Sequence, residues 1–161
     1  MKSSDDVFAD ELESKNERLY LILRGHLYIE NELNKLLENF LPNPSVLELY
    51  REGFRRKLDL ALALNLIEQD HFDIICAFNE IRNKYAHRLK YRISHQEITD
   101  LKNNMSKIEG YEELAETITI GDKSSSTIDL KVVIIALRSI FSERAIGVSK
   151  CENPTYNFEE M

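Results

Sequence analysis

The stretch GFRRKLDLALALNLIEQDHFDIICAFNEIRNKYAHRL, residues 53–89, decides the fold of this chain. It contains no proline, and its apolar residues recur every three to four positions, which is the period of an amphipathic α-helix. The pattern predicts one helix over residues 54–67 and a second from Gln69 to His87. The side chains expected to face the core are Phe54, Leu58, Ala61, Leu62 and Leu66 in the first helix, and Phe72, Ile75, Phe78, Ile81, Tyr85 and Leu89 in the second.

Helical patterns continue on both sides of this stretch. Upstream, an apolar period near 3.6 predicts a long helix over residues 10–40. The LPNPS run ends that helix because a proline disfavours helical geometry at the residue before it, and Ser45 is then expected to cap a short helix. Downstream, Ser94 and Glu97 form a capping-box pattern that predicts the start of another helix.

The pattern loosens after residue 110. The TITI run predicts a short extended piece, GDKSSST predicts a loop, and a last helix is expected over residues 127–145. These segments together predict an all-α antiparallel helical bundle of about five to six helices. We expect residues 1–150 to form a single domain and residues 151–161 to form a C-terminal tail.

Composition excludes several classes of protein. The chain of 161 residues carries a net charge of −7, which does not suit a protein that coats nucleic acid with a broad basic surface. No apolar run reaches the roughly 20 residues needed to cross a bilayer, and the first residues lack the apolar core of a signal peptide. The spacing of the two cysteines fits no metal motif, and the sequence has no glycine-rich phosphate loop. We therefore expect a cytoplasmic protein without metal or cofactor.

Positive charge nevertheless gathers in one segment, residues 81–96, which contains five basic residues and no Asp or Glu. This segment contributes five positive charges, so the remainder of the chain carries −12. Such a concentration predicts a local anion site, here a site for an RNA backbone. The basic residues are Arg82, Lys84, Arg88, Lys90 and Arg92.

Three residues of this segment can carry chemistry together. Asn83 and His87 are one helical turn apart, and we expect the chain to bend near His87 so that Arg82 and His87 reach one cleft. An arginine can bind phosphate, an asparagine can orient a hydroxyl, and a histidine can transfer protons. This is the set needed to cleave RNA without a metal. Because one arginine and one histidine are few groups for a catalytic site, we expect a homodimer that supplies two of each.

The six residues RNKYAH resemble the R-x4-H signature of the HEPN superfamily, in which a polar residue often follows the arginine. The upstream run F-x-x-K-L-x-L-A-x-A-L-x-L-I, followed by IRN-x-x-AH, is similar to the mannitol operon repressor-like branch (MltR-like) of that superfamily, and the likeness covers residues 19–101. The resemblance implies an all-α bundle that dimerises, with the motifs of two subunits at a shared cleft. It also implies a metal-independent endoribonuclease of toxin–antitoxin, phage-defence or RNA-processing systems, with Arg82 and His87 as the catalytic pair and Asn83 in support.

The same resemblance leaves a second function open. The repressor-like branch is named for transcriptional regulation, so the alternative is a non-enzymatic regulator or protein-interaction module. Leu89 stands where HEPN toxins paired with a nucleotidyltransferase antitoxin often carry a tyrosine, which disfavours that particular pairing. The partners expected are therefore a second copy of the chain, RNA with tRNA as one candidate, and an antitoxin or other regulatory protein.

Other polar residues admit two interpretations. Glu30 and Asn34, with His26, could line the cleft and orient His87, or they could form a solvated edge with internal hydrogen bonds. The FRRK run at residues 54–57 could bind an RNA backbone, but the solvated side of an amphipathic helix is favoured. The histidines expected at the surface are His71 and His95.

Overall fold

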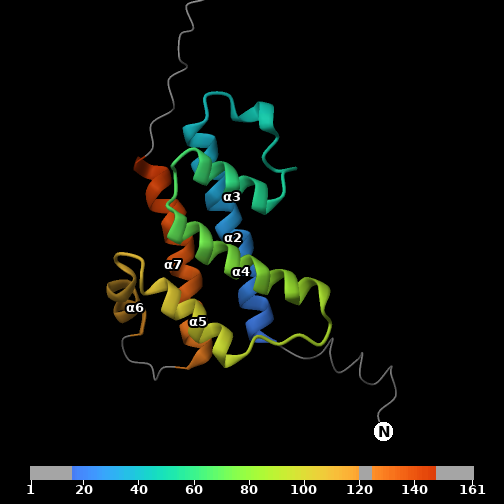
Figure 1. Cartoon of the computed structure of the whole chain (residues 1–161), viewed down its shortest axis with the longest axis vertical. Helices are drawn as coiled ribbons and strands as arrows, with labels where there is room; N and C mark the ends of the chain where they lie inside the picture. Colours follow the sequence, from blue (N-terminus) through green and yellow to red (C-terminus); the bar gives the residue numbers. More distant parts are fainter. Residues whose placement is uncertain (1–15, 120–124, 148–161) are drawn as a thin grey trace, which may run out of the picture.

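The structure is a computed structural model of the whole chain, and it describes residues 16–119 and 125–147. Within these ranges all regular structure is helical, with no strand, which confirms the predicted all-α class (Figure 1). The elements are α2 (Glu17–Phe40), the 3-10 turn η1 (Pro44–Leu47), α3 (Phe54–Ala63), α4 (Gln69–His87), α5 (His95–Met105), α6 (Tyr111–Thr119) and α7 (Ser126–Gly147).

The helices α2 and α7 form the most extensive packing in the bundle (Figure 1). Arg18 at the start of α2 donates to the hydroxyl of Ser126 at the start of α7, and Asn39 near the end of α2 donates to the carbonyl of Ala145. The two helices therefore run parallel. The predicted antiparallel order is wrong for this pair, because the four α-helices between them return the chain to its starting end. Gly25 permits the close approach, since a Cβ there would lie 2.7 Å from Cγ2 of Ile134.

One apolar cluster fills the space between the helices, and all six contribute to it. The predicted inward stripe of α4 is confirmed for four of its six members, and Tyr85 is half-buried. Leu89, however, is 78% exposed, because α4 ends at His87 and the stripe does not extend past it. Core side chains with no or almost no exposed surface include Ile22, Ile29, Leu33, Leu58, Ile75, Phe78, Ile98, Leu137 and Phe141.

The start of α4 holds a feature that the sequence pattern did not predict. The carboxylate of Glu68 accepts from the backbone of His71, and Nδ1 of His71 accepts from the backbone N–H of Glu68 at 3.4 Å. This is a capping box in which a histidine replaces the usual Glu or Gln. His71 is only 7% exposed, so the expectation that it lies at the surface is wrong. His95 is exposed as predicted.

The end of α3 lies earlier than the apolar pattern predicts. Asn65 adopts φ 54°, its N–H donates to the carbonyl of Leu62, and the N–H of Leu66 donates to the carbonyl of Ala61. These two bonds form a Schellman motif, which ends the helix at Ala63 and still turns Leu66 into the core. The predicted helix over residues 54–67 is therefore four residues too long.

Two further expectations are corrected, and one is confirmed. Residues 117–119 of the TITI run belong to α6, so the extended piece expected there is wrong. The short helix after LPNPS is a 3-10 turn that begins after Asn43, with Pro44 at its first position, so Ser45 does not cap it. The capping box of Ser94 and Glu97 is present at the start of α5. Residues 10–15, 120–124 and the predicted tail lie outside the described residues.

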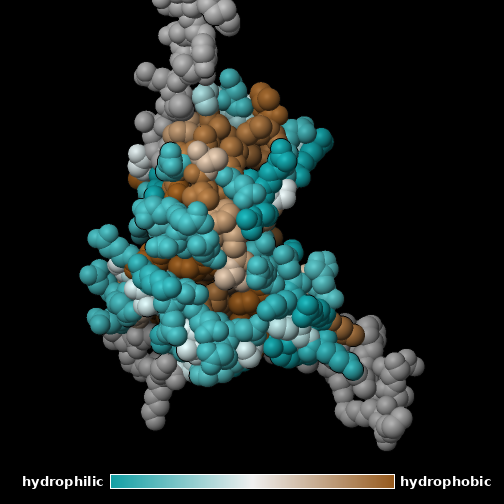
Figure 2. Space-filling view, viewed as in Figure 1, coloured by the Kyte–Doolittle hydropathy of each residue, from teal (hydrophilic) through white to brown (hydrophobic). Residues whose placement is uncertain are grey.

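Apolar side chains are not confined to the core. Figure 2 shows an apolar area over η1, at the upper end of the view, where Val46 is 78% exposed and Leu47 is also exposed. Tyr20, Leu27 and Tyr28 are exposed on α2. No described helix is both long enough and apolar enough to cross a membrane.

Candidate functional site

The motif residues Arg82, Asn83 and His87 lie on the last two turns of α4. Nη1 of Arg82 donates a hydrogen bond to Oδ1 of Asn83 at 3.1 Å, so the half-buried guanidinium and the amide form one unit. His87 is the last residue of the helix, and its imidazole is exposed. Within the described ranges no side chain or backbone group hydrogen-bonds to its ring. Arg82 is thus bonded to Asn83, whereas the ring of His87 has no hydrogen-bond partner among the described residues.

Arg82 and His87 do not share a face within one chain. The helix remains regular through His87, and Arg88 is the first residue with extended backbone, at φ −129° and ψ 99°. Five residues of α-helix correspond to a rotation of about 140°, so the two side chains leave α4 in different directions. The bend that we expected to bring them into one cleft is therefore wrong, because the chain turns only after His87.

The segment that follows His87 folds back against α4. The hydroxyl of Tyr85 accepts from the N–H of Ile93 at 2.9 Å, and the rings of Tyr85 and Tyr91 meet edge to face. Nζ of Lys84 lies 3.0 Å from a carboxylate oxygen of Glu97. These contacts hold residues 91–97 against the end of α4 that carries His87.

Glu97 is the acid that limits the positive charge of this segment. Partial burial alone would raise its pKa, but hydrogen bonds from Ser94, Lys84 and Tyr91 bring the pKa of Glu97 down to about 2. Glu97 is therefore ionised at neutral pH and neutralises Lys84. Among the predicted RNA-binding residues, Arg88 and Lys90 remain exposed, while Arg92 donates to the carbonyls of Leu89 and Tyr91.

A second polar group lies where α2, α3 and α4 meet. Nε2 of His26 is 3.0 Å from Oδ1 of Asn79, and Nδ1 of His26 is 4.0 Å from a carboxylate oxygen of Glu30. Glu30 also accepts from Nζ of Lys57. We call His26, Glu30, Lys57 and Asn79 the buried polar group, since His26 is 3% and Lys57 is 2% exposed. Lys57 was expected on a solvated helix side, and that expectation is wrong.

This group shows internal bonds for one of the two α2 residues, Glu30, that were considered for the cleft. Glu30 takes part in internal bonds and has no described contact with His87. Oδ1 of Asn34 is buried, and no partner within the described ranges satisfies it. Neither side chain orients His87 directly. Asn79 was missed, although its spacing of four residues from Asn83 and of eight from His87 was a signal that all three belong to one line on α4.

The charge state of His26 follows from its surroundings. Burial lowers the pKa of His26, and the neighbouring cations of Arg82 and Lys57 lower it further, against the opposite effects of Asn79 and Glu30. His26 is therefore neutral at pH 7. Because the oxygen of an asparagine amide can only accept, Nε2 of His26 carries the proton and donates to Asn79.

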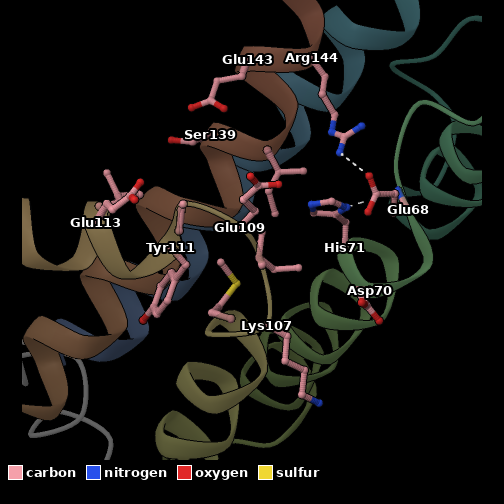
Figure 3. Close-up of a pocket in the computed structure, with 16 residues that line it drawn as sticks. Glu68, Asp70, His71, Lys107, Glu109, Tyr111, Glu113, Ser139, Glu143 and Arg144 are labelled. Atoms are coloured by element: carbon pink, nitrogen blue, oxygen red, sulfur yellow. Dashed lines mark hydrogen bonds and ion pairs between the residues drawn. The ribbon is translucent and has the colours of Figure 1, made fainter.

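A pocket of about 730 Å³ lies at the other end of α4 (Figure 3). His71 contributes to its wall, and Arg144 of α7 reaches across to Glu68 and to the carbonyl of Leu66. His71 and His87 are sixteen residues apart, which is about 24 Å along the helix axis. The pocket is therefore separate from the motif residues. No three His, Cys, Asp or Glu side chains in the described part of the chain are placed to hold a metal ion together.

Comparison of this chain with protein-family models, with curated proteins and with solved structures gave no match.

Proposed function

We propose that this chain is a HEPN-type, metal-independent endoribonuclease that acts on cytoplasmic RNA as a homodimer. One observation carries the proposal: the bonded pair Arg82 and Asn83 lies on the same helix end as an exposed, uncommitted His87. Arg88 and Lys90 add exposed positive charge beside them. An anion such as an RNA phosphate is the ligand that this combination favours.

The proposed chemistry uses proton transfer and charge stabilisation alone. His87 in its neutral form takes the proton of the ribose 2′-hydroxyl, and the 2′-oxygen attacks the adjacent phosphorus. The bond from phosphorus to the 5′-oxygen breaks, and the protonated His87 of the second copy gives its proton to that oxygen. Arg82 stabilises the negative charge of the phosphorane, and Asn83 orients Arg82. The products are a 2′,3′-cyclic phosphate and a 5′-hydroxyl.

A homodimer supplies what one chain lacks. Arg82 and His87 of one chain diverge by about 140°, so a second copy is needed to place an arginine and two histidines around one phosphate. Tyr20, Leu27 and Tyr28 are large, exposed side chains on α2. We propose this surface as the contact between the two copies. A nuclease of this kind would also need a regulatory protein partner, such as an antitoxin.

The decisive test is cleavage of total RNA and of purified tRNA in EDTA, followed by analysis of the ends of the products. The parent protein should cleave and leave cyclic phosphates, whereas Arg82→Ala and His87→Ala should not cleave. Arg56→Ala and His95→Ala are matched controls, because both side chains are exposed and lie outside the motif.

The outcomes separate the two functions. Loss of cleavage in the motif variants alone, with normal cleavage by the controls, supports the nuclease. Equal cleavage by all five proteins would trace the activity to a contaminant and reject the proposal. If the parent protein cleaves no RNA even after denaturation and refolding to remove an inhibitor, the regulator is the better interpretation.

A further inference from the structure

The buried polar group contacts α4 one turn before the motif, at Asn79. Asn79, Asn83 and His87 follow one another at intervals of four residues, so they form a line that turns only slowly around the helix. Arg82 lies three residues, or about one turn, after Asn79, so the two side chains are neighbours on the surface of α4. Asn79 is thus beside the guanidinium that the proposed function assigns to the phosphate.

His26 fixes the orientation of the Asn79 amide. Its ring is packed against the ring of Phe54, with centroids 4.4 Å apart, and only 3% of the residue is exposed. Because Nε2 of His26 donates to Oδ1 of Asn79 at 3.0 Å, the amide cannot rotate without losing that bond. The oxygen of Asn79 is therefore held toward His26 on α2, and the two hydrogens of its Nδ2 group take no part in that bond.

The Lys57–Glu30 ion pair explains how His26 is kept in place. A lysine that is 2% exposed costs free energy unless a partner offsets its charge, and Glu30 is that partner. The pair links α2 to α3 on the side of His26 away from Asn79. The imidazole is thereby held between Glu30, Phe54 and Asn79, which leaves it no room to turn.

We infer that Asn79 is a further RNA-binding residue, whose Nδ2 group donates to a backbone phosphate oxygen beside Arg82, and that His26 is the residue that positions it. Nδ2 of Asn79 has no hydrogen-bond partner within the described residues, and the residue is only partly buried. An amide donor next to a guanidinium gives one phosphate two different groups to bind. This inference rests on the proposed function for its ligand.

Asn79→Asp is the sharpest variant for testing this. Aspartate keeps an oxygen acceptor for Nε2 of His26, so the contact between α2 and α4 should persist. It replaces the two donor hydrogens by a second acceptor and adds a negative charge beside the phosphate. We expect a rise of at least about tenfold in KM for RNA, or the same loss of affinity for a 2′-O-methyl RNA that cannot be cleaved. The melting temperature should stay near that of the parent.

Asn103→Asp is the matched control, since it makes the same chemical change at an exposed position on α5. It should bind and cleave like the parent. If Asn79→Asp also binds the 2′-O-methyl RNA as tightly as the parent, the inference is overturned while the nuclease can stand. If the parent binds this RNA without cleaving RNA, the nuclease fails and the affinity of Asn79→Asp still decides the inference. A parent that neither binds nor cleaves RNA overturns both.

The positioning role of His26 is tested separately, by the RNA affinity of two His26 variants. His26→Gln can still donate to Oδ1 of Asn79, whereas His26→Leu has a similar size and no donor. We expect His26→Gln to keep most of the affinity for RNA and His26→Leu to lose as much of it as Asn79→Ala. If the two His26 variants lose affinity equally, in step with their melting temperatures, His26 has a structural role only.

Discussion

The two ends of α4 each carry a histidine, and the two histidines are used in different ways. His71, at the start, is 7% exposed, and its Nδ1 accepts from the backbone of Glu68. His87, at the end, is exposed, and no described residue binds its ring. His71 stabilises the beginning of a helix, whereas the imidazole of His87 makes no hydrogen bond to the described residues. A histidine whose side chain has no such partner is the better candidate for chemistry.

The charged groups near the two ends of α4 also differ. Near His71, the cation of Arg144 is already bound to Glu68 and to a backbone carbonyl. Three carboxylates of the neighbouring pocket, those of Glu109, Glu113 and Glu143, make that region acidic. Near His87, Arg88 and Lys90 are exposed cations, and the neighbouring acid Glu97 is paired with Lys84. The proposed phosphate site therefore lies at the end of α4 that carries exposed cations, and the acidic pocket lies at the other end.

Replacing each histidine in turn gives the largest predicted effect. His87→Ala should lower kcat/KM for RNA cleavage by about 10³-fold, the typical contribution of a proton-transferring side chain, without a change in the free energy of unfolding. His71→Ala should leave cleavage by folded molecules unchanged but reduce the free energy of unfolding by about 1–2 kcal/mol, because half of the capping box is lost. Cleavage assays and urea unfolding measure both. A folded His71→Ala protein that no longer cleaves RNA would break the comparison.

Removing the charge of Glu97 gives the next largest effect. Its folded-state pKa of about 2 lies below the value of 4.5 for an unperturbed glutamate, so the ionised form stabilises the fold. That stabilisation is complete above pH 4.5 and is lost as the pH falls towards 2. Glu97→Gln keeps the capping box and should cost about 2 kcal/mol at pH 7. The difference in stability between the parent and Glu97→Gln should vanish near pH 2; a difference that persists there would mean that charge is not the cause.

The pH dependence of stability should also reveal His71. Burial lowers the pKa of His71 from 6.5, and the cation of Arg144 lowers it further. Below pH 6.5 His71 is therefore protonated in the unfolded chain but stays neutral in the folded chain. The free energy of unfolding then falls as the pH drops below that value, by at most about 1.4 kcal/mol per pH unit. His71→Gln retains an acceptor for the capping box but does not titrate. It should show a shallower slope between pH 5 and 6.5 than the parent; an identical slope would place the titration elsewhere.

Sequence reasoning succeeded where short-range signals determine the structure. The bounds of α4 and the cap of α5 depend on periodicity and on residues three apart, and both were predicted. The end of α3 was missed because the apolar period continues through Leu66, although Asn65 is a residue type that often takes positive φ after a helix. The parallel order of α2 and α7 was also missed, since contacts between residues more than 100 positions apart set it.

The candidate site likewise has a part that the sequence predicts and a part that it does not. The motif residues Arg82, Asn83 and His87 are visible in the sequence because their spacing within one helix alone defines them. The bond from His26 to Asn79 joins residues 53 positions apart and depends on how α2 crosses α4, so no local pattern predicts it. The burial of Lys57 likewise depends on Glu30 in another helix.

Mixed dimers would test the most specific consequence of the comparison, that one phosphate requires His87 from two copies. Parent chains co-expressed with a threefold excess of His87→Ala chains should pair at random, so only about one quarter of the parent chains meet another parent chain. Cleavage per parent chain should then fall about fourfold. With the same excess of His71→Ala chains, cleavage counted per chain of either kind should be unchanged, because every dimer then keeps two copies of His87 and His71 lies about 24 Å away along α4. If the excess of His87→Ala has no effect although mixed dimers are present, each chain carries a complete site, and the 140° divergence of Arg82 and His87 is bridged within one molecule.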